Sequence, residues 1–380
     1  MTQTNFIAQI ENHLTSLSTK DLTPLVSAVI GKVHAQVINC TSQRVSGGMG
    51  GGVGGTAIYR LQGDARISSQ SDVHRWSLIA KILQARQGET PTDSHYWRRE
   101  AEVYQSGILQ SLAPHISAPR FIDITEYPGE SCWLWLEDVP DDQPGQWTPE
   151  QHVIAARHLG QFSARYLQNP IPHLDWLSQN WIKQDVKRFG SRVFHLEELR
   201  QHPLVSRWLT NTTIETLQQL WDERELFWTA LERLPETLCH YDAFRRNLLS
   251  HNDQTVMLDW SFVGNGPLGA ELVATFWVNA IFEEIAREDL KTLDAALFES
   301  YITGIHDAGW RGDAQQIRLG YCAALGLRWL AGVGIQARDI AQSLTDGQPI
   351  SPSYINSMTE AGRIIHERVQ EARQLINGLE

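Results

Sequence analysis

Cysteine and methionine are scarce in this chain of 380 residues, which contains four of each. The cysteines, Cys40, Cys132, Cys239 and Cys322, lie far apart, and no pair has the C-x-x-C spacing of a thiolate metal site. The sequence therefore predicts neither a zinc site built on thiolates nor a disulfide framework. Such cysteine usage fits a reducing compartment.

Long apolar runs and an excess of positive charge are also missing. The longest uncharged apolar run, LVATFWVNAIF, is too short to span a bilayer. The first residues, MTQTNFIAQIENHL, do not have the basic and apolar segments of a signal peptide. The formal net charge of −12 argues against nucleic acid or an anionic membrane as a partner. We therefore expect a cytoplasmic protein that binds neither; its oligomeric state is left open.

The pattern of apolar residues changes near Pro140. Residues 5–35 have helical spacing, and five strand-like segments with one helix after the third follow up to Val139. Beyond PDDQPGQ the pattern is helical almost to the end, and only residues 237–260 contain strand-like pieces. We expect an α+β chain with an N-terminal helical extension (1–35), a part built on an antiparallel sheet (36–139) and a mostly helical part (140–380) with a helical insert at about 172–235.

A glycine-rich stretch, GGMGGGVGG, lies between two predicted strands. Gly50, Gly52 and Gly55 fit G-x-G-x-x-G, and glycine lets backbone N–H groups approach a phosphate closely. A loop between two strands excludes the dinucleotide fingerprint, which needs a following helix, and the absence of G-K-S/T excludes a Walker loop. A flexible hairpin that binds nothing is an equally good interpretation.

Lys81 lies within the apolar run SLIAKIL, where an ammonium group is costly unless it is paired. Glu100 and Glu102 of the next predicted helix are candidate partners. An apolar stripe on that helix includes Ala101 and Tyr104; Glu100 flanks this stripe, whereas Glu102 lies nearly opposite it. Helical geometry therefore favours Glu100 as the partner. The alternative is a lysine at a sheet edge that reaches water.

The segment HYDAFRRN and the following strand-like VMLDW carry the strongest signal of chemistry. Asn247 and Asp259 offer the hard oxygen ligands that Mg²⁺ takes together with substrate phosphates. Asp242 is then available to accept a proton from an attacking hydroxyl. Taken singly, His240 could be a core histidine, Asp242 a turn former and Asn247 a cap. The order of the glycine run, Lys81 and this cluster favours the catalytic interpretation.

These residues resemble the aminoglycoside phosphotransferase and choline kinase family, with protein kinases as more distant relatives. HYDAFRRN matches the family's H-x-D-x-x-x-x-N loop, and LDW stands where protein kinases have D-F-G. The resemblance implies a protein-kinase-like bilobal fold, in which a small antiparallel sheet lobe accompanies a mostly helical lobe. It also implies that Asp242 is the catalytic base and that Asn247 and Asp259 hold Mg²⁺.

The resemblance further implies a nucleotide site. Lys81, paired to Glu100, would hold the α- and β-phosphates of ATP. WLEDV resembles the family's hinge, where the carbonyl of Glu137 and the N–H of Val139 would meet the adenine edge. The sequence departs from the family in several places. Tyr241 stands where glycine is frequent, and Glu271 occupies the place of an acidic residue that is commonly aspartate.

Arg246, immediately before Asn247, could neutralise the transferring phosphoryl group; a salt bridge within the helical lobe is as good an interpretation. We expect an ATP- and Mg²⁺-dependent kinase that acts on a hydroxyl of a small molecule. The alternative is a kinase-like protein that binds a nucleotide or ligand without turnover. The insert is rich in tryptophan, which suits an amine acceptor if these residues form a cage and a hydrophobic core if they do not. The tryptophans are Trp176, Trp181, Trp208, Trp221 and Trp228.

Overall fold

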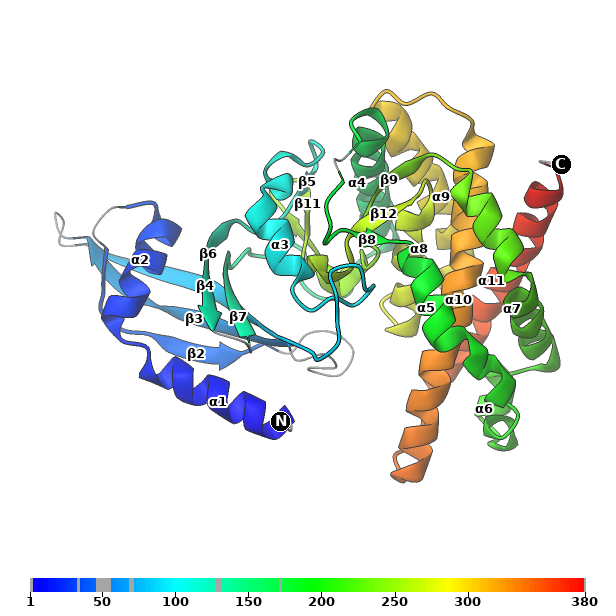
Figure 1. Ribbon diagram of the computed structural model, residues 1–380, viewed down its shortest axis with the longest axis horizontal. Helices are drawn as coiled ribbons and strands as arrows, with labels where there is room; N and C mark the ends of the chain where they lie inside the picture. The colour runs from blue at the N-terminus through cyan, green and yellow to red at the C-terminus, as the bar shows by residue number, and fades with distance from the viewer. Residues whose placement is uncertain are drawn as a thin grey trace. The chain divides into compact units, whose positions relative to one another are not determined.

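The computed structural model describes residues 3–32, 35–45, 56–67, 72–127, 131–170 and 173–378. The predicted glycine loop, with Gly50, Gly52 and Gly55, lies outside the described residues. The chain divides into two compact units (Figure 1). The first unit comprises residues 1–91, 95–110 and 118–142, and the second comprises residues 92–94, 111–117 and 143–380.

The first unit is built on an antiparallel sheet with strand order β1-β3-β4-β7-β6, and β2 also pairs with β3. Two long central strands form its middle, where eleven residue pairs run from Thr56↔Leu83 to Arg66↔Val73. The strands are β1 (Ala35–Val37), β2 (Thr41–Arg44), β3 (Thr56–Ile67), β4 (Val73–Gln84), β6 (Phe121–Tyr127) and β7 (Ser131–Glu137).

Two N-terminal helices, α1 (Gln3–Ser16) and α2 (Thr19–Ile30), belong to the core of this unit. Ser18 and Asp21 form a capping box that fixes the start of α2. Apolar residues of both helices, among them Ile10 and Val26, share one buried cluster with the sheet residues Leu61 and Trp135. The N-terminal segment thus supplies part of the apolar cover that an isolated sheet face needs.

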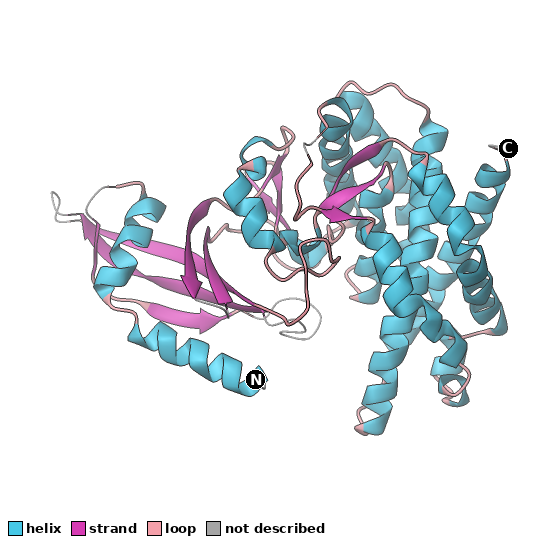
Figure 2. Ribbon diagram, viewed as in Figure 1, coloured by secondary structure: helices cyan, strands magenta, loops and turns pink. Residues whose placement is uncertain are grey.

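The second unit is mostly helical, as Figure 2 shows. Two small sheets, β10-β11-β5 and β8-β12-β9, lie within it. The strands are β5 (Ile116–Ser117), β8 (Ser178–Gln179), β9 (Glu236–Cys239), β10 (Leu248–His251), β11 (Gln254–Met257) and β12 (Gly264–Pro267). The helices are α4 (Pro149–Gln168), α5 (Trp181–Phe189), α6 (Val205–Trp208), α7 (Asn211–Glu232), α8 (Val273–Ile281), α9 (Leu290–Asp307), α10 (Ala314–Thr345) and α11 (Pro352–Asn377).

The expected α+β class is confirmed, but several element bounds differ from the sequence prediction. The first predicted strand is broken into β1 and β2, because the side chain of Asn39 bonds both the amide and the carboxylate of Asp64 across the sheet. The predicted helix that carries Glu100 and Glu102 is short, α3 (Arg99–Ser106), since Gly107 follows with a φ of 75°. Helix α9 lies within the part predicted as mostly helical. Among the described residues, no helix is long and apolar enough to cross a membrane.

Candidate active site

Three of the predicted site residues lie at one end of the β10–β11 hairpin. In this hairpin Leu248 pairs with Met257. One more backbone hydrogen bond follows this pair, from the amide of Leu258 to the carbonyl of Asn247 at 2.8 Å. Asn247 precedes β10, and Asp259 follows β11 by one residue. The register therefore brings Asn247 and Asp259 to the same end of the hairpin, although both strands of the hairpin lie between them in the sequence.

Residues 240–247, the HYDAFRRN loop, are tied together by side-chain hydrogen bonds. Asn247 Nδ2 donates to Asp242 Oδ2 at 2.8 Å and to the carbonyl of Asp242 at 3.0 Å. The buried His240 bonds the carbonyl of Leu258 through Nε2 at 2.8 Å, and its Nδ1 accepts from the amide of Asp242 at 3.2 Å. A carbonyl only accepts, so this pair of contacts assigns the ring proton to Nε2. One imidazole thus links Asp242 to the residue before Asp259.

The carboxylates of Asp242 and Asp259 favour a bound cation at this end of the hairpin. The pKa of Asp242 is raised to about 6, because burial and the nearby charge of Asp259 outweigh the lowering by Arg328 and by the hydrogen bond from Asn247. Two carboxylates that repel each other in a half-buried place are stabilised by a bound cation. The described residues hold no group of three or more His, Cys, Asp or Glu side chains that could bind a metal ion by themselves. One amide and one carboxylate nonetheless fit Mg²⁺, which keeps several waters and nucleotide oxygens in its shell.

Lys81 and Glu100 form a buried ion pair in the first unit. Lys81 lies on β4 between Ile58 of β3 and Leu134 of β7. Its Nζ lies 2.5 Å from Glu100 Oε2, and the two side chains are 6% and 1% exposed. Glu102 instead pairs with Arg98 at 3.0 Å and is 29% exposed. The structure therefore selects the glutamate that the helical-face argument favours.

The segment predicted as a hinge follows β7, which ends at Glu137. The amide of Glu137 donates to the carbonyl of Arg120 at 3.0 Å. Asp138 is held by a two-pronged ion pair with Arg60, at 2.7 and 3.0 Å, and also accepts a hydrogen bond from Ser77. Asp138, which sequence reasoning did not single out, thus fixes the segment between Glu137 and Val139 to strands β3 and β4.

A family model described as the phosphotransferase enzyme family matches residues 71–312, more than half of the chain. The chain belongs to this family. Family membership identifies it as a small-molecule kinase and confirms the resemblance and the protein-kinase-like fold inferred from sequence. No curated protein matches the chain.

Solved structures of this phosphotransferase fold are similar to the chain at low sequence identity. An amicoumacin kinase in complex with AMP-PNP, Ca²⁺ and Ami has 13% identity and a TM-score of 0.53, over 86% of this chain and 88% of that one. A microcompartment-associated aminopropanol kinase has 14% identity and a TM-score of 0.50, over 89% and 94%. A spectinomycin phosphotransferase in complex with ADP and spectinomycin has 14% identity and a TM-score of 0.50, over 93% of this chain and 100% of that one. At identities this low, the structural similarity shows the shared fold alone.

Glu271, in this phosphotransferase, supports the HYDAFRRN loop from the following segment. Its Oε2 accepts from the amide of His240 at 2.6 Å and from the amide of Tyr241 at 3.2 Å. Burial raises the pKa of Glu271 to about 8, although these two backbone hydrogen bonds lower it. The acidic residue at the place where the family commonly has aspartate thus holds the backbone directly before Asp242.

Arg328 is the most prominent residue at the site that sequence reasoning missed. It lies on α10, and its Nη2 is 3.4 Å from Asp242 Oδ1. Its side chain is 10% exposed. The signal that could have found it is the one used for Lys81, a single cation within an apolar run, here LGLRWLAG.

The two arginines of the HYDAFRRN loop make different contacts. Arg245 is buried, donates to the carbonyls of Gln143, Gly145 and Leu248, and stacks on Trp147. Arg246 pairs with Glu284 at 2.6 Å, and its side chain is 43% exposed. The salt-bridge interpretation of Arg246 predicts such a contact. The catalytic role of Arg246 stays a prediction.

Three of the five tryptophans of the insert have a ring face covered by one of the protein's own cations. Lys183 lies 5.0 Å from the ring of Trp228, and Arg224 lies 4.3 Å from that of Trp221. Arg328 lies 4.8 Å from the ring of Trp181. Trp181, Trp208 and Trp228 are at most 3% exposed. These contacts favour the interpretation of the tryptophans as core over that of a ligand cage.

Proposed function

We propose that this kinase transfers the γ-phosphoryl group of ATP to a hydroxyl group of a small molecule in a Mg²⁺-dependent reaction. The single observation that carries the proposal is the arrangement of Asp242, Asn247 and Asp259, joined through His240 at one end of a hairpin. An incoming hydroxyl needs a base, and the transferred group needs charge neutralisation. This loop offers residues for both.

Asp242 is the proposed base. A pKa of about 6 leaves its carboxylate mostly ionised at neutral pH and still basic enough to take a proton as the hydroxyl attacks. Asn247 orients the carboxylate through its hydrogen bond to Oδ2. The oxygens of Asn247 and Asp259 would hold Mg²⁺, which when bound neutralises negative charge on the phosphate groups.

Lys81 is the proposed ligand of the α- and β-phosphates. Glu100 pairs with its ammonium group within the sheet, where an unpaired cation is costly. The backbone of Glu137 and Val139 would bind the adenine edge, and the two-pronged contact of Asp138 with Arg60 keeps that segment in place. Gly50, Gly52 and Gly55 are the proposed phosphate loop, on the sequence pattern alone.

The acceptor is proposed to contact the helical insert of about 172–235. Because cations of the chain already cover the rings of Trp181, Trp221 and Trp228, the contacts do not favour a quaternary ammonium cage. Hydroxyl-bearing amines, sugars and antibiotics all fit the proposed chemistry.

The test is a nucleotide-consumption assay with purified protein and Mg·ATP over a panel of hydroxylated amines, sugars and antibiotics. We expect at least one compound to raise ADP formation well above the rate with water alone, and Asp242→Asn to abolish that rise. Mg·ATP binding without any turnover across the panel and with water would instead support the alternative, a kinase-like binding protein.

A further inference from the structure

Tyr241, directly before the proposed base, has an unusual backbone conformation. Its φ of 65° lies in the left-handed region that favours glycine, so surrounding contacts must hold a tyrosine there. Its Oη donates to the carbonyl of Asn265 at 2.9 Å, and its ring stacks on Trp181 at 5.1 Å. Gly266 leaves room for the phenol, since a Cβ at that position would lie 2.1 Å from the Tyr241 hydroxyl.

The peptide that joins Tyr241 to Asp242 is held at its carbonyl by Arg328. Nη1 of Arg328 donates to this carbonyl, and Nη2 faces Asp242 Oδ1 at 3.4 Å. The guanidinium itself rests on the ring of Trp181 at 4.8 Å, on which Tyr241 also stacks. One planar cation therefore contacts both the main chain before the base and the carboxylate of the base.

We propose that Arg328 is a positioning residue that fixes the direction of the Asp242 carboxylate. The inference rests on the proposed function, because it assigns Arg328 its role through Asp242 as base. Asn247 bonds Oδ2 of Asp242 and Arg328 faces Oδ1, so each carboxylate oxygen has a neighbour that limits its rotation. Misplacement of a reacting group by about 1 Å costs roughly 100-fold in rate. The tyrosine in a glycine-like conformation makes such support necessary.

The chain offers a matched control on the same helix. Arg318 of α10 also stacks on an aromatic ring, at 4.5 Å from Phe298, and pairs with a carboxylate, that of Glu371, at 2.6 Å. Among the residues that the structure describes, its partners Phe298, Tyr321 and Glu371 lie on helices α9, α10 and α11 and not on the HYDAFRRN loop. Arg318→Met and Arg328→Met therefore remove equivalent groups in two different settings.

The experiment measures release of phosphate from Mg·ATP with water as the acceptor, together with the thermal shift produced by Mg·ATP. For Arg328→Met we expect kcat to fall by roughly 100-fold, with the KM for ATP and the Mg·ATP shift unchanged. Arg328→Lys, which keeps a cation and a donor, should recover much of kcat. Arg318→Met should lower the melting temperature and leave kcat per folded molecule unchanged.

Two results would overturn the inference. One is a wild-type kcat in Arg328→Met, or in Arg328→Gln should the methionine variant not fold. The other is an equal loss of kcat in Arg318→Met, which would mean that any disturbance of α10 has the same effect. Failure of the proposed function looks different, because the wild-type protein itself would then release no phosphate, whether or not Mg·ATP shifts its melting temperature.

Discussion

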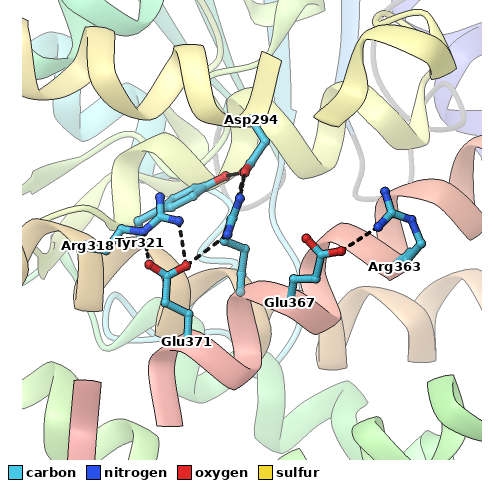
Figure 3. A network of polar contacts seen from close by, with 7 residues as sticks. Asp294, Arg318, Tyr321, Arg363, Glu367 and Glu371 are labelled. Carbon is cyan, nitrogen blue, oxygen red and sulfur yellow. Dashed lines mark hydrogen bonds and ion pairs between the residues drawn. The ribbon is translucent and has the colours of Figure 1, made fainter. Parts of the chain in front are cut away.

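Helix α10 carries two arginines, the half-buried Arg318 and the buried Arg328, that take part in two differently built charge networks. Around Arg318, every carboxylate oxygen has a partner: Arg318 bonds both oxygens of Glu371, and Arg368 and Tyr321 bond the two oxygens of Asp294 (Figure 3). Around Arg328, the contact to Asp242 is 3.4 Å long, and a second carboxylate, Asp259, adds repulsion. The first network joins α9, α10 and α11, whereas the second joins α10 to the HYDAFRRN loop.

The pKa values of Glu371 and Asp242 reflect this difference between the two networks. Burial pushes the pKa of Glu371 up, but the hydrogen bonds and charges of Arg318 and Arg368 outweigh it, so the pKa is lowered. At Asp242 burial prevails, and the pKa rises to about 6. A lowered pKa means that the ionised group stabilises the fold, and a raised one means that its charge disfavours folding. The comparison teaches that the Arg318 network stabilises the fold. The negative charge of Asp242, in contrast, is only partly compensated by its neighbours, as is typical of a group that takes part in a reaction.

The largest effect is expected at Asp242, where one substitution should change turnover without lowering stability. Asp242→Asn removes the proposed base, so turnover should fall by about 10²–10⁴-fold. Because the buried charge disfavours folding, the melting temperature should stay the same or rise. Phosphate release and thermal unfolding measure the two quantities on one preparation. A large loss of stability with turnover retained would contradict this division.

Asp294→Ala should have the opposite profile. Arg368 and Tyr321 would lose a buried partner, and breaking a buried ion pair costs roughly 3 kcal/mol in the free energy of unfolding. Urea unfolding measures that loss, and kcat per folded molecule should not change. If Asp294→Ala unfolds as easily as the wild type, the network does not have the stabilising role assigned to it.

The pH dependence of stability separates carboxylates from buried histidines. Since the pKa of Glu371 is lowered, its contribution is present above its usual value and is lost only as the pH falls through the lowered value. Burial, aided by the charges of His115 and Arg157, lowers the pKa of His158 from 6.5 to about 4. Its neutral form stabilises the fold above pH 6.5, and this contribution is lost progressively as the pH falls from 6.5 towards 4.

For a partly shielded histidine we expect a loss on the order of 1–3 kcal/mol across this window. His158→Gln should remove the part of this pH-dependent loss that comes from His158, because glutamine does not titrate. Glutamine can still form the hydrogen bond with Thr255. Unfolding free energies at a series of pH values measure the effect; parallel curves for wild type and variant would exclude His158 as a contributor.

The smallest effect is expected at Glu102 of α3, whose neighbour Glu100 completes the same contrast within one helix. Glu102→Ala removes a partly exposed pair with Arg98 and should change stability by less than about 0.5 kcal/mol. Glu100→Ala leaves the buried Lys81 without this partner and should weaken nucleotide binding. Thermal shifts with and without Mg·ATP compare the two variants, and a reversed order would remove Lys81–Glu100 from the proposed phosphate site.

Local patterns made part of this structure predictable. Helical periodicity was enough to select Glu100 over Glu102 as the partner of Lys81. Arg328 lies 86 residues from Asp242, and no local pattern relates an arginine on one helix to a loop so far away. The break between β1 and β2 depends on the contact of Asn39 with Asp64, which exists only once the sheet has formed.

The most direct test of the central claim is a thermal-shift titration of Asp259→Asn with ATP, with and without Mg²⁺. In this account Asp259 and Asn247 hold the metal, while Asp242 serves as base. Asp259→Asn should therefore lose the Mg²⁺-dependent part of the stabilisation by ATP, whereas Asp242→Asn should keep it. A full Mg²⁺-dependent shift in Asp259→Asn would contradict the assignment of Asp259 as a metal ligand and favour a binding protein without turnover.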